Sequence, residues 1–339
     1  MAAKSLIHSP LNGFKVEAFN GKFAGKDMVS IRQFTDKIEV AKVFNVAGQM
    51  EKIVKSKVNS DILKHVTMAE LFYQPSTRTF TSFLSAARWL GCKRVVAIHG
   101  MEAYSSVTKG ESLPDTIMSI EQTTACDIIV MRHPEDNSAF EAAHFASVPI
   151  VNGGSGKLEH PTQAVLDLYT IYRRLGTMTG LKVGMLGDLL NGRTVKSLSK
   201  ILTLVDPKAK LYFISPKVLE LPRAEVAELK ERGAQVMETA DLGSVLPDLD
   251  VLYVTRIQKE WFKTPSQQKL YEKLKGQYDI NNKWLKMAKK RMIVMHPLPR
   301  VGEITYEVDD DPRAAYFGEM RMGLYTRMAL LALLTGKIK

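Results

Sequence analysis

The chain has 339 residues, which is too many for one ordinary hydrophobic core and enough for two packed domains. Hydrophobic residues make up 45% of the sequence and charged residues 24%, and this balance excludes a disordered or collagen-like chain. The formal net charge of +11 favours anionic partners, namely nucleic acid, a membrane surface or small anionic substrates, without choosing among them.

No apolar run approaches the roughly 18–20 residues that a membrane span needs, and the best one covers only 328–334. The N-terminus lacks the apolar middle of a secretion signal, although a targeting peptide removed earlier would leave no trace. Cys92 and Cys126 indicate buried, reduced thiols rather than a disulfide framework. We therefore expect a cytoplasmic protein with no membrane partner.

Short apolar runs alternate with amphipathic stretches along the chain. The predicted strands occupy 93–98, 127–131, 148–151, 181–186, 210–214, 250–255 and 291–295. The predicted helices occupy 80–90, 112–125, 136–146, 161–175, 193–205 and 223–232. Strands that are apolar throughout and separated by helices are typical of parallel sheets covered on both faces. The predicted fold class is therefore α/β, with two doubly wound parallel-sheet domains joined by helices.

The domain boundary is predicted from a Gly-rich segment, 152–156, followed by a helix that begins near Pro161. A last apolar helix, roughly 323–335, carries one apolar face and is expected to return to the first domain. The predicted domains are 1–161 with 323–339, and 162–322. Residues 1–35 carry no chemistry that we can assign.

The first candidate site is a cluster of hydroxyl groups and a guanidinium before the predicted helix 80–90. It consists of Ser76, Thr77, Arg78 and Thr79. A helix N-terminus attracts anions through its unpaired backbone N–H groups and its dipole. An ordinary helix cap needs one hydroxyl and no arginine, so the cluster predicts a phosphate site.

Three further motifs are weak when taken singly. Ser105 and Lys109 lie in a polar loop, which is more typical of a solvated turn before a capped helix. Arg132 ends a predicted strand, where an arginine is often a surface ion-pair partner. His160 and Gln163 lie at a helix start, and a lone histidine is more often structural than catalytic. Each of these motifs gains weight only from the others.

The segment 187–194, GDLLNGRT, resembles the nucleotide-binding P-loop but has Arg193 where that loop has its lysine. The planar fork of arginine suits bidentate capture of a carboxylate. We interpret Arg193 as part of a carboxylate clamp, with nucleotide binding as the weaker alternative.

Two more motifs follow predicted strands. Arg256 and Gln258 come after the strand 250–255, and the sequence HPLPR, with Pro297 and Leu298, comes after 291–295. Prolines in such a turn can hold backbone carbonyl groups outward as acceptors for an N–H-bearing ligand. A rigid structural turn explains this motif equally well when it is taken alone.

Together these motifs resemble the carbamoyltransferase family, in its aspartate-using branch. The matching segments, in chain order from 76 to 300, are STRTF, SxxxKGES, VMRHP, HPTQ, GDLxxGRT, TRIQKE and HPLPR. The resemblance implies transfer of the carbamoyl group from carbamoyl phosphate to the α-amine of L-aspartate, giving N-carbamoyl-L-aspartate and phosphate in pyrimidine synthesis. It implies no metal or organic cofactor.

The resemblance also implies a role for each candidate residue. Arg78, Thr79, Arg132 and His160 would be catalytic. Carbamoyl phosphate would contact Ser76, Thr77, Arg78, Thr79, Arg132, His160, Gln163, Pro297 and Leu298, with Ser105 and Lys109 arriving from a neighbouring subunit of a homotrimer. Aspartate would contact Arg193, Arg256, Gln258, Lys109 and Leu298. A regulatory subunit or a larger assembly is left open.

Two alternatives remain beside this interpretation. In the ornithine-using branch the substrate carries a side-chain ammonium, which Arg193 and Arg256 would repel, and a cysteine marks the late turn, where this chain has HPLP. The basic segment 256–300 interleaves aromatic residues with lysines, a pattern also found in nucleic-acid surfaces. We favour a mobile lid over the aspartate pocket and expect no nucleic-acid partner.

Overall fold

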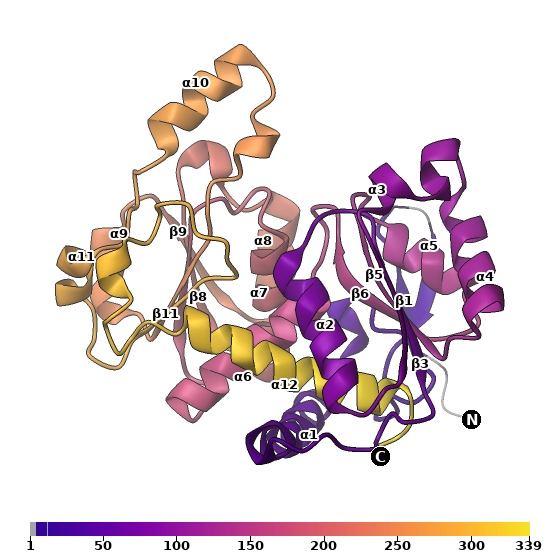
Figure 1. Ribbon diagram of the computed structural model, residues 1–339. Helices are drawn as coiled ribbons and strands as arrows, with labels where there is room; N and C mark the ends of the chain where they lie inside the picture. Colours follow the sequence, from indigo (N-terminus) through magenta and orange to yellow (C-terminus); the bar gives the residue numbers. More distant parts are fainter. Residues whose placement is uncertain (1–4, 12) are drawn as a thin grey trace. The chain divides into compact units, whose positions relative to one another are not determined.

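The computed structural model describes residues 5–11 and 13–339 and contains two compact units (Figure 1). Unit 1 comprises Met1–Leu166 with Met320–Lys339, and unit 2 comprises Asp167–Glu319. Residues 1–4 and 12, which belong to the unassigned N-terminal segment, lie outside the described part. The chain passes between the units within two helices, α6 (Pro161–Leu175) and α12 (Tyr316–Leu334).

Unit 1 is built on a parallel sheet with the strand order β4-β3-β5-β6. Its strands are β3 (Thr67–Phe72), β4 (Arg94–His99), β5 (Ile128–His133) and β6 (Ile150–Ser155), beside a small antiparallel pair, β1 (Leu6–His8) and β2 (Lys15–Glu17). Its helices are α1 (Lys37–Ser56), α2 (Thr77–Trp89), α3 (Met101–Tyr104), α4 (Leu113–Thr124) and α5 (Ser138–Phe145), with short 3-10 turns at Ile31–Gln33 and Ser106–Lys109.

The alternation of side chains along β3 sends its residues to opposite faces of this sheet. Ala69 and Leu71 join a buried cluster that includes Ile117 of α4 and Phe140 of α5. Phe72 faces the other way and makes an edge contact with Phe80 of α2, with ring centroids 5.3 Å apart. Helices therefore cover both faces of the sheet, as Figure 1 shows for α2 on one side and α4 and α5 on the other.

Unit 2 is built on a parallel sheet with the strand order β11-β10-β7-β8-β9. Its strands are β7 (Lys182–Leu186), β8 (Lys210–Ile214), β9 (Gln235–Thr239), β10 (Val251–Val254) and β11 (Ile293–Met295). Its helices are α7 (Arg193–Val205), α8 (Arg223–Glu231), α9 (Leu242–Val245), α10 (Pro265–Leu274) and α11 (Asn282–Met287). In Figure 1, α7 and α8 lie on one side of this sheet and α9 and α11 on the other.

The predicted α/β class with two parallel sheets is confirmed, and every predicted strand and helix is present, with ends within a few residues of the predicted ones except for the start of the last helix. The sequence analysis did not predict the strands β1, β2, β3 and β9 or the helices α1, α3, α9, α10 and α11. Cys92 and Cys126 are buried free thiols, as predicted. Within the described residues, no helix combines the length and the apolar character that a membrane crossing requires.

Two local expectations were wrong. We expected the Gly-rich segment 152–156 to be a loop before the helix at Pro161, but β6 continues to Ser155. Within this strand, the Asn152 side-chain amide donates to the Val29 carbonyl and accepts from the Gly154 backbone N–H. The last helix begins seven residues earlier than 323, at Tyr316, and its second half is buried on all sides rather than on one face. A helix that is apolar all round is expected to lie inside a core.

Gly187, which follows β7, permits the loop after β7 to pack closely against the loop after β10 in unit 2. Gly187 has φ +117°, and a Cβ added there would lie 2.1 Å from the carbonyl oxygen of Thr255. The Thr255 backbone N–H already donates to the Leu186 carbonyl at 2.8 Å, so the loop after β10 cannot retreat without losing this bond.

We predict that Gly187→Ala lowers the free energy of unfolding by about 2–4 kcal/mol, through a steric clash added to backbone strain. Gly302→Ala is the matched control, because Gly302 has φ +110° and open space around its Cβ position. Urea unfolding followed by tryptophan fluorescence measures both. Equal losses in the two variants would show that the contact with Thr255 is unimportant.

Candidate active site

The N-terminus of α2 presents an anion-binding arrangement at the end of β3. Ser76 is the N-cap, but its side chain makes no capping hydrogen bond, so its hydroxyl is not used to complete the helix. Its backbone N–H donates to His99 Nε2 at 3.2 Å, which fixes the start of the turn. Thr77 is exposed and Arg78 is half-buried. The first-turn N–H groups of such a helix have no intrahelical acceptor and favour an anion.

Arg78 adds a positive charge to this helix start. Burial lowers the pKa of its guanidinium, and among the described residues no carboxylate forms an ion pair with it. A half-buried cation at the positive end of a helix dipole is electrostatically unfavourable unless an anion joins it. The arrangement is therefore suited to a phosphate group.

Thr79, Arg132 and His160 come together around Gly153 of β6. Thr79 Oγ1 lies 3.5 Å from His160 Nε2, and both side chains are buried. The Arg132 guanidinium donates to the Gly153 carbonyl at 3.1 Å. A Cβ on Gly153 would lie 3.5 Å from the Thr79 methyl group and 3.0 Å from the Met131 carbonyl, so the glycine permits this close approach. Gln163 lies less than one helical turn after His160, in the first turn of α6, and is also buried.

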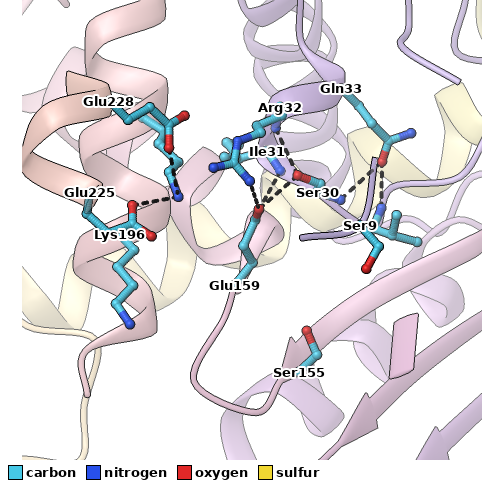
Figure 2. A network of polar contacts seen from close by, with 12 residues as sticks. Ser9, Ser30, Ile31, Arg32, Gln33, Ser155, Glu159, Lys196, Glu225 and Glu228 are labelled. Atoms are coloured by element: carbon cyan, nitrogen blue, oxygen red, sulfur yellow. Dashed lines mark hydrogen bonds and ion pairs between the residues drawn. The ribbon is translucent and has the colours of Figure 1, made fainter. Parts of the chain in front are cut away.

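The unassigned N-terminal segment anchors the residue next to His160. Figure 2 shows the buried Glu159 carboxylate between Ser30, Ile31 and Arg32. It accepts from the Ser30 hydroxyl at 2.8 Å and the Ile31 backbone N–H at 2.7 Å, and it lies 3.7 Å from Arg32. Sequence reasoning missed this role, because the partners are more than 120 residues apart.

A second support that the sequence did not reveal comes from α12. The buried Arg327 donates to the Ser82 hydroxyl, and its guanidinium lies 5.1 Å from the centre of the Phe83 ring. Ser82 in turn donates to the Thr79 carbonyl at 3.1 Å. The C-terminal helix therefore holds the first turn of α2 in place.

Ser105 and Lys109 are not brought to these residues. The Ser105 hydroxyl donates to the Met101 carbonyl at 2.7 Å and accepts from the Val107 N–H, which are both local contacts. Lys109 is exposed at the end of the 3-10 turn Ser106–Lys109. The prediction that they serve a neighbouring subunit stays a prediction.

In unit 2, the buried Asp188 carboxylate draws together the loops that carry Arg193 and Gln258. It accepts from the Asn191 backbone N–H at 3.0 Å and from the Asn191 side-chain amide. It also accepts from the backbone N–H of Gln258 at 3.4 Å. Arg193 follows as the first residue of α7, at another helix N-terminus.

Arg256 forms an ion pair with the carboxylate of Glu260, four residues further along the chain. Arg256 donates to both Glu260 oxygens, through Nη1 at 2.9 Å and through Nη2. Burial raises the pKa of Glu260, but the Arg256 hydrogen bond and the charges of Arg256 and Arg193 outweigh it, so the pKa is lowered. Unit 2 therefore contains a place where one guanidinium group, that of Arg256, holds a carboxylate, and the charge of Arg193 adds to the attraction.

The turn after β11 is held by the His296 imidazole. Its Nδ1 accepts from the Leu298 backbone N–H at 2.7 Å, so the proton of the neutral ring lies on Nε2, which is 2.7 Å from Glu303. Leu298 has φ +53°, a conformation that costs an L-residue roughly 1–2 kcal/mol, and the Leu298–Pro299 peptide bond is cis. Pro297 and Leu298 are both partly exposed, as a binding role requires.

A cavity of about 330 Å³ lies elsewhere, beside the second half of α2. It is lined by Asn59, Leu84, Ser85, Arg88 and Trp89, and by none of the predicted site residues. The geometry of the strand ends, not this cavity, defines the candidate site.

Most of the chain matches two models of one family. Residues 26–173 match the carbamoyl-phosphate-binding domain of aspartate/ornithine carbamoyltransferases, and residues 179–334 match the aspartate/ornithine-binding domain. The chain belongs to the aspartate/ornithine carbamoyltransferase family.

Individual members of this family resemble the chain in sequence and in fold. The chain is 47% identical over 312 residues to the aspartate carbamoyltransferase catalytic subunit of Thermococcus gammatolerans, covering 92% of this chain and 98% of the relative. It is 46% identical over 322 residues to the multifunctional protein pyr1-3 of Dictyostelium discoideum, covering 94% of this chain but only 14% of that protein. A crystal structure of aspartate transcarbamoylase from Trypanosoma cruzi with carbamoyl phosphate and aspartate matches with a TM-score of 0.85 and 36% identity, covering 92% of this chain and 97% of that one.

Proposed function

We propose that this chain transfers the carbamoyl group of carbamoyl phosphate to the α-amine of L-aspartate, forming N-carbamoyl-L-aspartate and phosphate for pyrimidine biosynthesis. The observation that carries the proposal is the ion pair between Arg256 and the Glu260 carboxylate, since aspartate brings carboxylates and ornithine brings an ammonium group. The aspartate carbamoyltransferase relatives support the same choice.

Unit 1 binds carbamoyl phosphate in this proposal. The phosphate lies at the N-terminus of α2, against Ser76, Thr77 and Arg78, with Arg132 beside it. Thr79, Arg132 and His160 donate to the carbamoyl oxygen, and Gln163 contacts the carbamoyl NH₂ group. Their grouping around Gly153 supports this assignment.

Unit 2 binds aspartate. Arg193, Arg256 and Gln258 hold its carboxylates, so the substrate takes over the role that Glu260 has in the structure. The Pro297 and Leu298 carbonyl groups accept from the attacking amine and the carbamoyl NH₂ group. The His296 contact that fixes Leu298 supports this role for the turn.

The reaction is then a displacement at the carbamoyl carbon. The unprotonated α-amine forms the new C–N bond, negative charge grows on the carbamoyl oxygen, and the C–O bond to phosphate breaks. Each preorganised donor to that oxygen can stabilise the transition state by about 3–4 kcal/mol. His160 acts as a donor rather than a base, because the departing phosphate can take the amine proton itself, and Arg78 neutralises the phosphate charge.

The active assembly in this proposal is a homotrimer in the cytoplasm. Ser105 and Lys109 of one subunit complete the phosphate site of the next, which agrees with their isolation from the other site residues within one chain. Buried free thiols suit a reducing compartment.

A steady-state assay that offers aspartate and ornithine side by side, with carbamoyl phosphate as donor, tests the proposal. We expect carbamoylation of aspartate and none of ornithine above background. Preference for ornithine would refute the proposal, and magnesium-dependent binding of ATP or GTP would favour the P-loop alternative.

Arg256→Ala should raise the KM for aspartate by about 10²-fold or more and leave the KM for carbamoyl phosphate within a few-fold, because a bidentate charged contact is worth about 3 kcal/mol. Arg232→Ala is a matched control, since Arg232 also pairs with a glutamate one helical turn away, in α8. Equal damage to both substrates would contradict the role assigned to Arg256.

The shared site predicts complementation between two inactive proteins. Arg78→Ala and Lys109→Ala should each abolish activity as pure homotrimers, because each removes a phosphate contact. Subunit exchange should restore activity, since some sites then combine an intact Arg78 with an intact Lys109 from the neighbour. Correctly assembled hybrids that stay inactive would exclude the exchange of Lys109 between subunits.

A further inference from the structure

A short N-terminal segment, residues 28–32, lies along the outer edge of β6, and we call it the brace. The Met28 backbone N–H donates to the Ile150 carbonyl at 2.8 Å, and the Asn152 N–H donates to the Met28 carbonyl at 2.9 Å. Since β6 is the last strand of its sheet, these bonds add the brace to the edge of that sheet. The brace therefore has a fixed position in unit 1, although the sequence assigned no chemistry to it.

The buried Gln33 side chain keeps the brace in shape. Its Oε1 accepts from the Val29 and Ser30 backbone N–H groups at 2.7 Å and 3.1 Å. Its Nε2 donates to the Glu17 and Asp27 carbonyl groups at 2.9 Å and 2.8 Å. All four contacts are independent of the connection between β6 and α6. The brace is thus a separate support against which that connection can be held.

The Asn152 side chain ties the first part of this connection to the brace. Its Nδ2 donates to the Val29 carbonyl at 2.9 Å and to the Ser155 hydroxyl at 3.0 Å. The next residue is Gly153, whose carbonyl accepts from the Arg132 guanidinium. The brace therefore holds the chain directly before one residue of the candidate site.

The Glu159 side chain ties the second part of the connection to the brace. Its carboxylate accepts from the Ser30 hydroxyl at 2.8 Å and from the Ile31 backbone N–H at 2.7 Å, and Figure 2 shows both contacts. Its backbone carbonyl accepts from the Ser155 N–H at 3.1 Å. Glu159 is buried and directly precedes His160, so the brace also holds the chain before the imidazole.

The position of the His160 ring depends on the backbone on both of its sides. After His160, the first turn of α6 is closed by the Gln163 and Ala164 N–H groups, which donate to the His160 carbonyl at 3.0 Å and 3.2 Å. Before His160, the contact with the brace is made by Glu159. A misplacement of about 1 Å can cost about 10²-fold in rate, so a loss of this contact has a catalytic price as well as a structural one.

We propose that Glu159 is a positioning residue, which binds the brace and thereby holds the His160 imidazole where it donates to the carbamoyl oxygen. The effect on catalysis rests on the proposed function. The hold of the brace on the connection between β6 and α6 concerns the fold of unit 1 alone. The two parts have separate tests.

Two substitutions of Glu159 separate the contact from the charge. Glu159→Ala removes the acceptor of both the Ser30 hydroxyl and the Ile31 N–H. Glu159→Gln removes the charge but keeps both contacts, because its carbonyl oxygen accepts from Ile31 while its amide nitrogen donates to the Ser30 hydroxyl oxygen. The conservative variant should therefore behave like the parent.

In steady-state carbamoylation of aspartate, Glu159→Ala should lower kcat by about tenfold or more, as a fraction of the 10²–10³-fold that a lost oxyanion donor costs. The KM for aspartate should stay within a few-fold, because the aspartate contacts belong to unit 2. Glu159→Gln should keep kcat within about threefold of the parent. A folded Glu159→Ala with the kcat of the parent would overturn the positioning role, as would a Glu159→Gln as slow as Glu159→Ala.

Glu39→Ala is the control for a structural effect without positioning. Glu39 of α1 is a buried carboxylate of the same unit, and it accepts from the Thr35 N–H at 2.7 Å and from the Gly21 N–H. These partners also belong to the N-terminal region but not to the connection that carries His160. Urea unfolding should show a loss of stability in both alanine variants, whereas kcat should fall in Glu159→Ala alone. An equal fall of kcat in Glu39→Ala would show that general destabilisation explains the effect.

Ser30→Ala tests whether Glu159 acts through the brace, and it serves in place of Glu159→Ala if that variant does not fold. Ser30→Ala should lower kcat in the parent but have little further effect in Glu159→Ala, because the contact is then already lost. Single effects that multiply in the double variant, or a Ser30→Ala with unchanged kcat, would overturn this route.

Hydrogen exchange without substrate tests the hold of the brace independently of activity. Backbone N–H groups in 154–164 should exchange about tenfold faster or more in Glu159→Ala, or in Ser30→Ala, than in Glu39→Ala. Equal exchange in this segment would overturn the hold of the brace. If the parent itself does not carbamoylate aspartate, the proposed function fails, and the exchange rates still decide whether the brace holds the segment.

Discussion

The candidate site depends on the convergence of strand ends in a parallel sheet. Every strand of such a sheet points the same way, so the residues that follow the strands meet along one edge. In unit 1 this edge carries Thr79, Arg132 and His160, which lie around Gly153 although they span much of the unit's sequence. Within unit 1 the start of α2 adds the positive end of its dipole, and within unit 2 the start of α7 does the same for the loop of Arg193.

Carboxylates that are buried or half-buried hold the loops of the candidate site at these strand ends. Glu159 fixes the segment before His160, Asp188 holds the loops of Arg193 and Gln258, and Glu303 orients His296. Although the net charge of the chain is +11, these acidic side chains lie inside the fold. There they accept hydrogen bonds from backbone N–H groups and from an imidazole and so fix their positions. Each of these carboxylates accepts several hydrogen bonds, which offsets its burial.

The sequence predicted the parts of the fold that have a regular apolar pattern. The sequence pattern did not predict β3, because Glu70 interrupts its apolar run. Glu70 is nevertheless buried in the structure. Burial raises the pKa of the Glu70 carboxyl to about 9, although the charge of Arg327 acts in the opposite direction. The sequence pattern also failed for β9, because that strand is polar and half-exposed. In both cases the strand is fixed by its neighbours in the sheet rather than by its own composition.

The candidate site residues were predicted from sequence motifs. So many hydroxyl, guanidinium and imidazole groups directly after strands are hard to explain by a structural role alone. Their supports could not be predicted. Arg327 reaches Ser82 across 245 positions, and Glu159 reaches Ser30 across 129. No local pattern encodes such pairings, since each partner alone is a common residue. The matches to the two family models confirm the family resemblance.

The most direct test of the account is a crystal structure of this protein with N-(phosphonacetyl)-L-aspartate, a compound that joins a phosphonate to aspartate. The account predicts the phosphonate at the N-terminus of α2, against Ser76–Thr79 and Arg132, and the aspartate carboxylates on Arg193 and Arg256, with Glu260 displaced. A phosphonate bound away from α2, or carboxylates that contact neither arginine, would contradict it.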